Sequence, residues 1–295
     1  MPVVTVEGRR LTLSNLEKVL YADGTTKGEL LHYYAAHGAV LLPHLRDRPV
    51  SFLRYPDGPE GERFFAKNVP PGTPEWVRTA EVPRSGGGSM RQVVVEDLAA
   101  LAWAANLVVE FHTPQWRASD PGMADRLVFD LDPGAPATVL DCCVVARWLR
   151  DRLAADGLTA YAKTSGSKGL HLLCALRPVP SADASAYAKA LATEAAGELS
   201  GLAIAVMARN LRPGKVFIDH SQNAARKTTA TPYTVRARPR PTVSAPVTWD
   251  EIDTCADPAA LDFHLADIPD RLAALGDLLL PLTDPAEAAP LPALR

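Results

Sequence analysis

The chain of 295 residues is poor in cysteine, and its four cysteines show no C-x-x-C spacing. Cys142, Cys143, Cys174 and Cys255 therefore indicate neither a zinc site nor a disulfide framework. The sequence also lacks a long hydrophobic segment. Its longest largely apolar run, at 99–109, spans eleven residues and contains an asparagine, which is too short to cross a bilayer.

No secretory leader is visible, because charged residues (Glu7 and Arg9-Arg10) occur before any apolar segment could form. These absences predict a reduced, cytoplasmic protein. Internal repeats are absent too, and the glycine run at 86–88 lacks the G-K-[ST] ending of a phosphate-binding P-loop. A hydrophobic content of 47% with 22% charged residues is ordinary for a globular chain of one large or two modest cores.

Charge is unevenly distributed although the net value is only −3. Residues 209–240 contain eight basic side chains and one acid, giving 8 − 1 = +7. Residues 250–295 contain two arginines and ten acids, giving 2 − 10 = −8. A concentrated basic face attracts polyanions whatever the total charge is, although a solvated basic face without a partner would have the same composition.

The stretch Leu127–Gly134 carries the strongest chemical signal. Apolar residues lead to Asp130 and Asp132, and a Pro-Gly turn signal follows. Side chains two apart on a strand share a face, so the two carboxylates are expected to lie together and to repel one another. Hard divalent cations prefer such oxygen ligands. The alternative is a strand that ends with two solvated acids.

Two further stretches supply complementary groups. The segment 164–173 combines two serines, two glycines and Lys168 in a loop whose backbone can approach an anion closely, and His171 follows on a strand facing the acid pair. The strand 216–219 delivers a third carboxylate, Asp219, between Arg212 and Arg226. Three aspartates, an anion-binding loop and a belt of arginines are the components of metal-assisted nucleotidyl transfer.

Local patterns predict the remaining elements. Capping boxes at Ser14/Glu17 and Thr26/Glu29 predict helices that end near Tyr21 and at Leu42, where Pro43 stops the second. Adjacent aromatics point to opposite faces of a strand, so one of Phe64 and Phe65 is expected in the core and one in solvent. Further helices are expected at 97–106, 137–155, 182–198 and 270–280, and further strands at 50–55, 108–111, 159–163 and 233–238.

In combination, Val128–Gly134, Ser165–His171 and Val216–Asn223 resemble the three motifs of the archaeo-eukaryotic primase superfamily. The resemblance is nearest to the polymerase domain of bacterial DNA ligase D, and it covers roughly residues 5–280. It implies an α/β (α+β) fold with a primase-type catalytic core, in which mixed sheets form a central cleft with flanking helices. A single domain is expected over 1–280, with DNA-end contacts in 1–115, the catalytic part in 116–245, and a Pro/Ala-rich tail at 281–295.

The resemblance also implies roles for individual residues. Asp130, Asp132 and Asp219 would hold two metal ions, Mn²⁺ or Mg²⁺. The incoming nucleoside triphosphate would be bound by His112 at the sugar and by Ser165, Ser167, Lys168, His171, Arg212, Gln222 and Arg236. A pocket for a 5′-phosphate at a DNA gap or break would comprise Asn15, Lys18 and Lys27. Phe64 and Phe65 would stack on the template, and Arg54, Lys67 and Arg84 would also bind DNA. The arginine-flanked tip at 84–91 would help to bring two DNA ends together.

Such a protein is expected to extend 3′ ends during non-homologous end joining in the bacterial cytoplasm, at the nucleoid, with a preference for ribonucleotides. No K-x-D-G adenylation motif occurs. A separate ATP-dependent DNA ligase is therefore expected to seal the extended DNA strands, unless the chain is a fragment. A Ku-type end-binding protein is expected as a further partner. The competing interpretations are a haloacid-dehalogenase-type phosphatase, which the Pro133-Gly134 pair disfavours, a non-catalytic DNA-end scaffold, and a primer-making primase.

Overall fold

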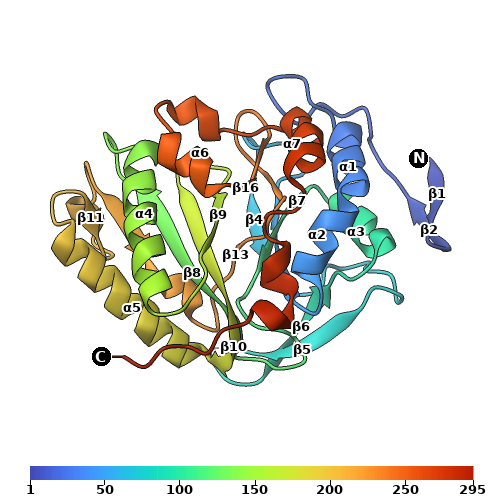
Figure 1. Cartoon of the computed structure of the whole chain (residues 1–295). Helices are drawn as coiled ribbons and strands as arrows, with labels where there is room; N and C mark the ends of the chain where they lie inside the picture. Colours follow the sequence, from blue (N-terminus) through green and yellow to red (C-terminus); the bar gives the residue numbers. More distant parts are fainter. Residues whose placement is uncertain (85, 295) are drawn as a thin grey trace.

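Two six-stranded sheets carry the fold in the computed structural model, which describes residues 1–84 and 86–294 (Figure 1). The first sheet has the order β11 (Ala203–Ile204), β12 (Val216–Asp219), β8 (Met123–Pro133), β10 (Leu170–Pro180), β9 (Tyr161–Thr164) and β16 (Pro246–Val247). The second has the order β13 (Thr229–Ala230), β7 (Val109–Thr113), β3 (Pro49–Arg54), β6 (Ser89–Val94) and β5 (Thr79–Pro83), with β4 (Phe64–Ala66) also paired to β3.

Helices divide between the two sheets. The long helices α4 (Val139–Ala155) and α5 (Ser181–Glu198) pack on β8 and β10, whereas α1 (Lys27–Ala36), α2 (Gly38–Leu45) and α3 (Leu98–Ala105) pack together on the other side of the molecule (Figure 1). The β8 residues Leu127, Phe129 and Leu131 are fully buried in the main core. Since alternate strand residues face opposite ways, Asp130 and Asp132 lie on the face away from these apolar side chains.

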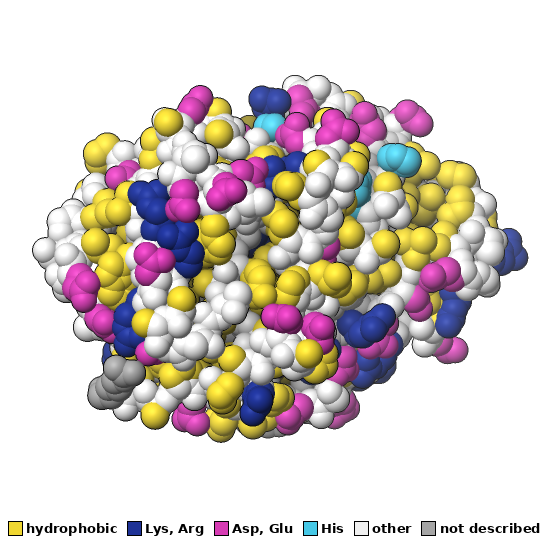
Figure 2. Space-filling model, viewed as in Figure 1, with side chains coloured by type: hydrophobic (Ala, Val, Ile, Leu, Met, Phe, Trp, Pro, Cys, Tyr) yellow, Lys and Arg dark blue, Asp and Glu magenta, His cyan; other side chains and the backbone are white. Residues whose placement is uncertain are grey.

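The remaining elements are short. Two hairpins, β1 (Val3–Val6) with β2 (Arg9–Thr12) and β14 (Val235–Arg236) with β15 (Thr242–Val243), lie outside the large sheets. Helices α6 (Trp249–Thr254) and α7 (Ile268–Leu275) lie along the edge where Figure 2 shows many acidic side chains. Single 3₁₀ turns are η1 (Arg209–Leu211), η2 (His220–Asn223), η3 (Pro258–Leu261), η4 (Leu265–Asp267), η5 (Leu280–Thr283) and η6 (Pro285–Glu287).

Several local predictions are confirmed. The Thr26/Glu29 capping box is formed and begins α1, and the predicted helices at 137–155 and 182–198 correspond to α4 and α5. A capping box of Thr138 and Asp141 fixes the start of α4. Within the described ranges, no helix is both long and apolar enough to cross a membrane.

Three local predictions are wrong. The segment 14–21 forms no helix, because Asn15 adopts a left-handed conformation (φ 54°) and the chain folds back so that Val19 pairs with Thr26. The second helix is broken at His37, and Pro43 lies inside α2 instead of ending it. Phe64 and Phe65 are both exposed, at 39% and 49%, because β4 is a three-residue strand paired with β3 and its two faces are open.

The C-terminal segment joins the two halves of the molecule. Leu279 and Leu282 pack with Val128 and Leu173 in a small core on the first sheet, while η5 contacts α2 of the other half. Asp277 accepts hydrogen bonds from His44 Nε2 at 3.0 Å and from the Tyr233 hydroxyl at 2.7 Å. Residues 277–283 are therefore part of the folded structure and contact both halves.

Replacing Asp277 by alanine is expected to lower the free energy of unfolding by about 1–3 kcal/mol, because two buried donors lose their acceptor. Urea denaturation followed by circular dichroism measures the change. Asp270→Ala, at an exposed position of α7 in the same segment, is the matched control and should cost less than about 1 kcal/mol. Equal losses for the two variants would contradict the linking role of Asp277.

Candidate active site

A row of ionisable side chains crosses four neighbouring strands of the first sheet. Lys163 on β9 lies opposite His171 on β10, His171 lies opposite Asp130 on β8, and Asp130 lies opposite Asp219 on β12. Residues directly opposite on paired strands point to the same face. Asp132, two residues beyond Asp130, points to that face as well. The structure thus brings the three predicted carboxylates and His171 together.

Negative charge is only partly compensated in this row. Reduced solvation of Asp132 and the neighbouring charges of Asp130 and Asp219 raise its pKa, with Arg212 acting in the opposite direction. Burial disfavours the charged form of Asp130, but His171, whose Nε2 lies 3.3 Å from Oδ1, outweighs burial and lowers the pKa of Asp130. Burial lowers the pKa of His171 to about 4, so its ring is neutral at pH 7 and donates to Asp130.

The donor set suits a hard divalent cation, since it offers carboxylate oxygens on one face at a place of excess negative charge. Two of the three carboxylates accept hydrogen bonds from neighbouring side chains. Gln222 Nε2 lies 2.9 Å from Asp219 Oδ2 and 3.5 Å from Asp130 Oδ2, and the Ser221 hydroxyl lies 2.6 Å from Asp219 Oδ1. Accordingly, no three acidic, histidine or cysteine side chains of the described chain are already oriented to hold a metal ion.

The loop between β9 and β10 lies next to this row. Ser165 Oγ accepts from the backbone N–H groups of Ser167 and Gly169, both at 3.2 Å, which closes the loop on itself. Gly169 is required here, because a Cβ at this position would lie 1.8 Å from the carbonyl oxygen of Leu131. The loop backbone therefore lies directly against the Asp-x-Asp strand.

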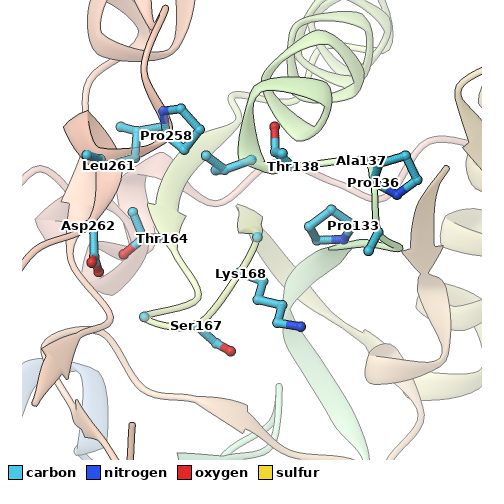
Figure 3. Close-up of a pocket in the computed structure, with 15 residues that line it drawn as sticks. Pro133, Pro136, Ala137, Thr138, Thr164, Ser167, Lys168, Pro258, Leu261 and Asp262 are labelled. Carbon is cyan, nitrogen blue, oxygen red and sulfur yellow. The ribbon is translucent and has the colours of Figure 1, made fainter. Parts of the chain in front are cut away.

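A pocket of about 470 Å³ lies beside the loop and is bordered by the start of α4 and by residues 258–262 (Figure 3). In Figure 3 the side chains of Ser167 and Lys168 point away from Pro258 and Thr138. Both side chains, which are among those predicted to bind a triphosphate, are exposed.

Two arginines approach from different directions. The Arg212 guanidinium stacks on the Phe217 ring at 3.7 Å, and Phe217 lies opposite Asp132 across the β8–β12 pair. Arg236, on β14, donates to the carbonyl oxygen of Ser165 in the loop. Both predicted arginines therefore flank the three carboxylates, which we call the acidic row. Arg212 lies at Asp132, and Arg236 lies at the loop.

Sequence reasoning missed Glu110, which connects His112 of the second sheet with Arg236 of the β14–β15 hairpin. Its carboxylate accepts from His112 Nε2 at 2.9 Å, Arg236 Nε at 2.8 Å and the backbone N–H of Ala237 at 2.6 Å. Burial opposes ionisation, but these donors and charges outweigh it and lower the pKa of Glu110 to about 2. The available signal was an acid inside an apolar strand, two residues before His112 and thus on the same face.

Lys163 was also missed as a member of the site. Its ammonium group is fully buried and donates to the Ser244 hydroxyl at 2.5 Å. Burial lowers the pKa of Lys163 well below its usual range.

Four of the residues predicted to bind DNA, namely Arg54, Phe64, Phe65 and Lys67, lie on or next to the paired strands β3 and β4. The Arg54 guanidinium lies 5.1 Å from the Phe64 ring, and Lys67 Nζ lies 5.8 Å from the Phe65 ring. The ring of Phe65 meets His112 edge-on at 5.8 Å, so this surface adjoins the predicted sugar site. Arg84 shares a groove of about 140 Å³ with Lys67 and Arg226. Of the predicted tip at 84–91, Ser85 lies outside the described residues.

Lys18 and Lys27 are brought together near Asn15. The backbone N–H of Lys27 donates to the Lys18 carbonyl, and Lys27 Nζ donates to the Ser14 hydroxyl at 3.0 Å. Lys27 is only 5% exposed, and its burial, followed by the charge of Lys18, lowers its pKa. Lys18 Nζ contacts Asp57 at 2.5 Å, so an anion in this pocket would compete with Asp57 for Lys18. A buried ammonium bonded to a hydroxyl is a site that an anion would stabilise.

Comparison with known proteins identifies the same family. The model of the LigD primase-polymerase domain matches residues 26–279. The chain is 42% identical to the multifunctional non-homologous end joining protein LigD of Mycolicibacterium smegmatis, over 95% of this chain and 37% of that protein. It is 30% identical to the bifunctional non-homologous end joining protein LigD of Bacillus subtilis, over 89% of this chain and 42% of that protein. The chain thus spans less than half the length of these relatives.

A solved structure agrees with this result and confirms the predicted mixed α/β fold. The polymerase domain of Mycobacterium tuberculosis ligase D, in complex with DNA, superposes with a TM-score of 0.88 at 42% identity, covering 95% of this chain and 99% of that one. The resemblance found in the three sequence motifs is confirmed. The matches to the family model, the relatives and the solved domain together show that the chain belongs to the LigD primase-polymerase domain family.

Proposed function

We propose that this protein is a template-directed nucleotidyltransferase that extends 3′ ends at gaps and double-strand breaks during non-homologous end joining. The observation that carries the proposal is the cross-strand placement of Asp219 opposite Asp130, with Asp132 on the same face and the Ser165–Gly169 loop beside them. Family membership supports the same reaction class.

In this proposal Asp130, Asp132 and Asp219 are the ligands of two divalent cations, Mn²⁺ or Mg²⁺. When bound, the ions would activate the attacking 3′ hydroxyl and stabilise the leaving pyrophosphate oxygen. The chain's own side chains bind the triphosphate: Ser165, Ser167 and Lys168 from the loop, and His171, Arg212, Gln222 and Arg236 from neighbouring elements. Lys168 and the two arginines neutralise its charge. His112 contacts the nucleotide sugar, and ribonucleotides are the preferred substrates.

The DNA is bound on the second sheet and near α1. Phe64 and Phe65, both exposed, stack on template bases, and Arg54, Lys67 and Arg84 contact the phosphate backbone. Asn15, Lys18 and Lys27 bind the 5′-phosphate at the far side of the gap. We infer a bacterial cytoplasmic location at the nucleoid, and partnership with an ATP-dependent DNA ligase and a Ku-type protein.

A non-catalytic scaffold that only holds DNA ends is disfavoured by the electrostatics of the acidic row. Burial, followed by the charges of Asp130 and Asp219, raises the pKa of Asp132, so the folded chain maintains mutual repulsion at this place. Such a cluster contributes nothing to binding a polyanion, whereas it is expected where cations complete the site.

Asp132→Ala is expected to reduce Mn²⁺-dependent extension of a gapped duplex by at least about 100-fold, because a cation loses one of its ligands. The melting temperature should stay the same or rise, since like-charge repulsion is relieved. Extension is measured with labelled nucleotides, and melting by differential scanning fluorimetry. Extension by the variant at the wild-type rate would show that the metal assignment is wrong.

The same extension assay with the wild-type protein tests whether the chain is a primase that makes its own primers. Products formed on a single-stranded template without a pre-existing 3′ end would assign primer synthesis. No metal-dependent product from either ribonucleotides or deoxyribonucleotides on any of these substrates would leave the DNA-end scaffold as the remaining function.

Lys27→Met is expected to abolish the advantage of a 5′-phosphate at the gap. The variant keeps the buried aliphatic stem but removes the ammonium, so the preference for phosphorylated over unphosphorylated gaps should fall by about tenfold or more. Binding is measured by fluorescence anisotropy with the two duplexes. Lys189→Met, at an exposed position on α5, is the control and should retain the preference. A preference unchanged in Lys27→Met would remove the phosphate role from this pocket.

A further inference from the structure

Glu110 lies in the interior of β7, and its side chain is only 3% exposed. Its two carboxylate oxygens accept three hydrogen bonds, from His112, Arg236 and the backbone of Ala237. A buried ionised carboxylate is stable only when donors satisfy it in this manner. The partners are therefore held in one geometry by a shared acceptor.

Two of the partners are side chains of the candidate nucleotide site. Arg236 donates through Nε to Glu110 and through its terminal nitrogen to the carbonyl oxygen of Ser165. This chain of contacts runs from β7 of the second sheet, through β14, to the loop between β9 and β10 of the first sheet. Glu110 thus connects the two sheets at the loop proposed to hold the triphosphate.

The same carboxylate fixes the ring of His112. Because Glu110 is ionised and only accepts, Nε2 of His112 must carry the proton in this contact. In the neutral ring Nδ1 is then an acceptor, and the ring is also in edge-on contact with Phe65. Both the orientation and the tautomer of His112 follow from Glu110.

We propose that Glu110 is a positioning residue for nucleotide binding, which holds His112 and, through Arg236, the Ser165–Gly169 loop in the geometry that receives a nucleoside triphosphate. This inference rests on the proposed function. It assigns Glu110 no contact with the substrate itself. Its effect is exerted on nucleotide affinity before the chemical step.

Glu110→Gln tests the proposal with little change in volume. An amide offers one oxygen and one N–H₂ group, so at least one of the three donors would face another donor. The KM for the nucleoside triphosphate should rise by about tenfold, with kcat reduced less than about threefold and the affinity for gapped DNA unchanged. Because KM does not depend on the fraction of folded enzyme, partial unfolding alone cannot produce this result.

Glu251→Gln is the matched control. Glu251 also binds an arginine, Arg271, and caps a helix through Thr248, but these partners belong to α6 and α7 and not to the candidate site. It should lower the melting temperature and leave the KM for nucleotide at the wild-type value. Glu110→Asp, which keeps the charge on a shorter side chain, should give an intermediate KM.

A KM for nucleotide within about twofold of wild type in Glu110→Gln, while wild type extends the gapped duplex, would overturn the positioning role and leave the proposed function intact. Failure of the wild-type protein to bind or use any nucleoside triphosphate with Mn²⁺ would overturn both. An equal rise of KM in Glu110→Gln and Glu251→Gln would show that the effect does not depend on the contacts of Glu110 with His112 and Arg236, and would also overturn the proposal.

The pH dependence of stability provides an independent readout of the Glu110 charge. Its pKa is lowered from 4.5 to about 2 in the folded protein, so its contribution is complete above pH 4.5 and is lost as the pH falls towards 2. The difference in urea midpoint between wild type and Glu110→Gln should therefore shrink between pH 6 and pH 3. A difference that is constant over this range would show that Glu110 is not the ionised acceptor of this network.

Discussion

The pairing of β12, β8, β10 and β9 in one register is the constraint on which the site depends. It lines up Asp219, Asp130, His171 and Lys163 across the sheet, and it places Asp132 on the same face. If any of these strands shifted by one residue, the ionisable side chain that it contributes would point into the apolar core under α4 and α5. The buried leucines and phenylalanine that alternate with the acids on β8 oppose such a shift, so the apolar face specifies the position of the charged one.

The second sheet and the C-terminal segment then complete the arrangement. Arg236 reaches from β14 to the loop of the first sheet, held by Glu110, while Asp277 connects His44 of α2 with Tyr233. The two connections lie at different places on the interface between the halves. Together they determine where His112 lies relative to the acidic row, because they hold the two halves against each other.

Sequence patterns predicted the parts of the site that depend on strand alternation. The common face of Asp130 and Asp132, and the orientation of His171 towards them, follow from a period of two and agree with the structure. The segment at 14–21 was predicted wrongly because its capping pattern competes with a turn at Asn15 and a pairing with Thr26. Strand alternation places Glu110 on the same face as His112, but its contact with Arg236, 126 residues away along the chain, could not be predicted. Local patterns contain no information about such a contact.

The close approach of Gly169 to the carbonyl of Leu131 has a consequence for how the site can change during evolution or in the laboratory. With no space for even a methyl group, the tip of this hairpin and the Asp-x-Asp strand behave as one rigid unit. New substrate preferences are therefore more easily acquired at the neighbouring positions 167 and 168, whose side chains project freely, than by remodelling the loop backbone.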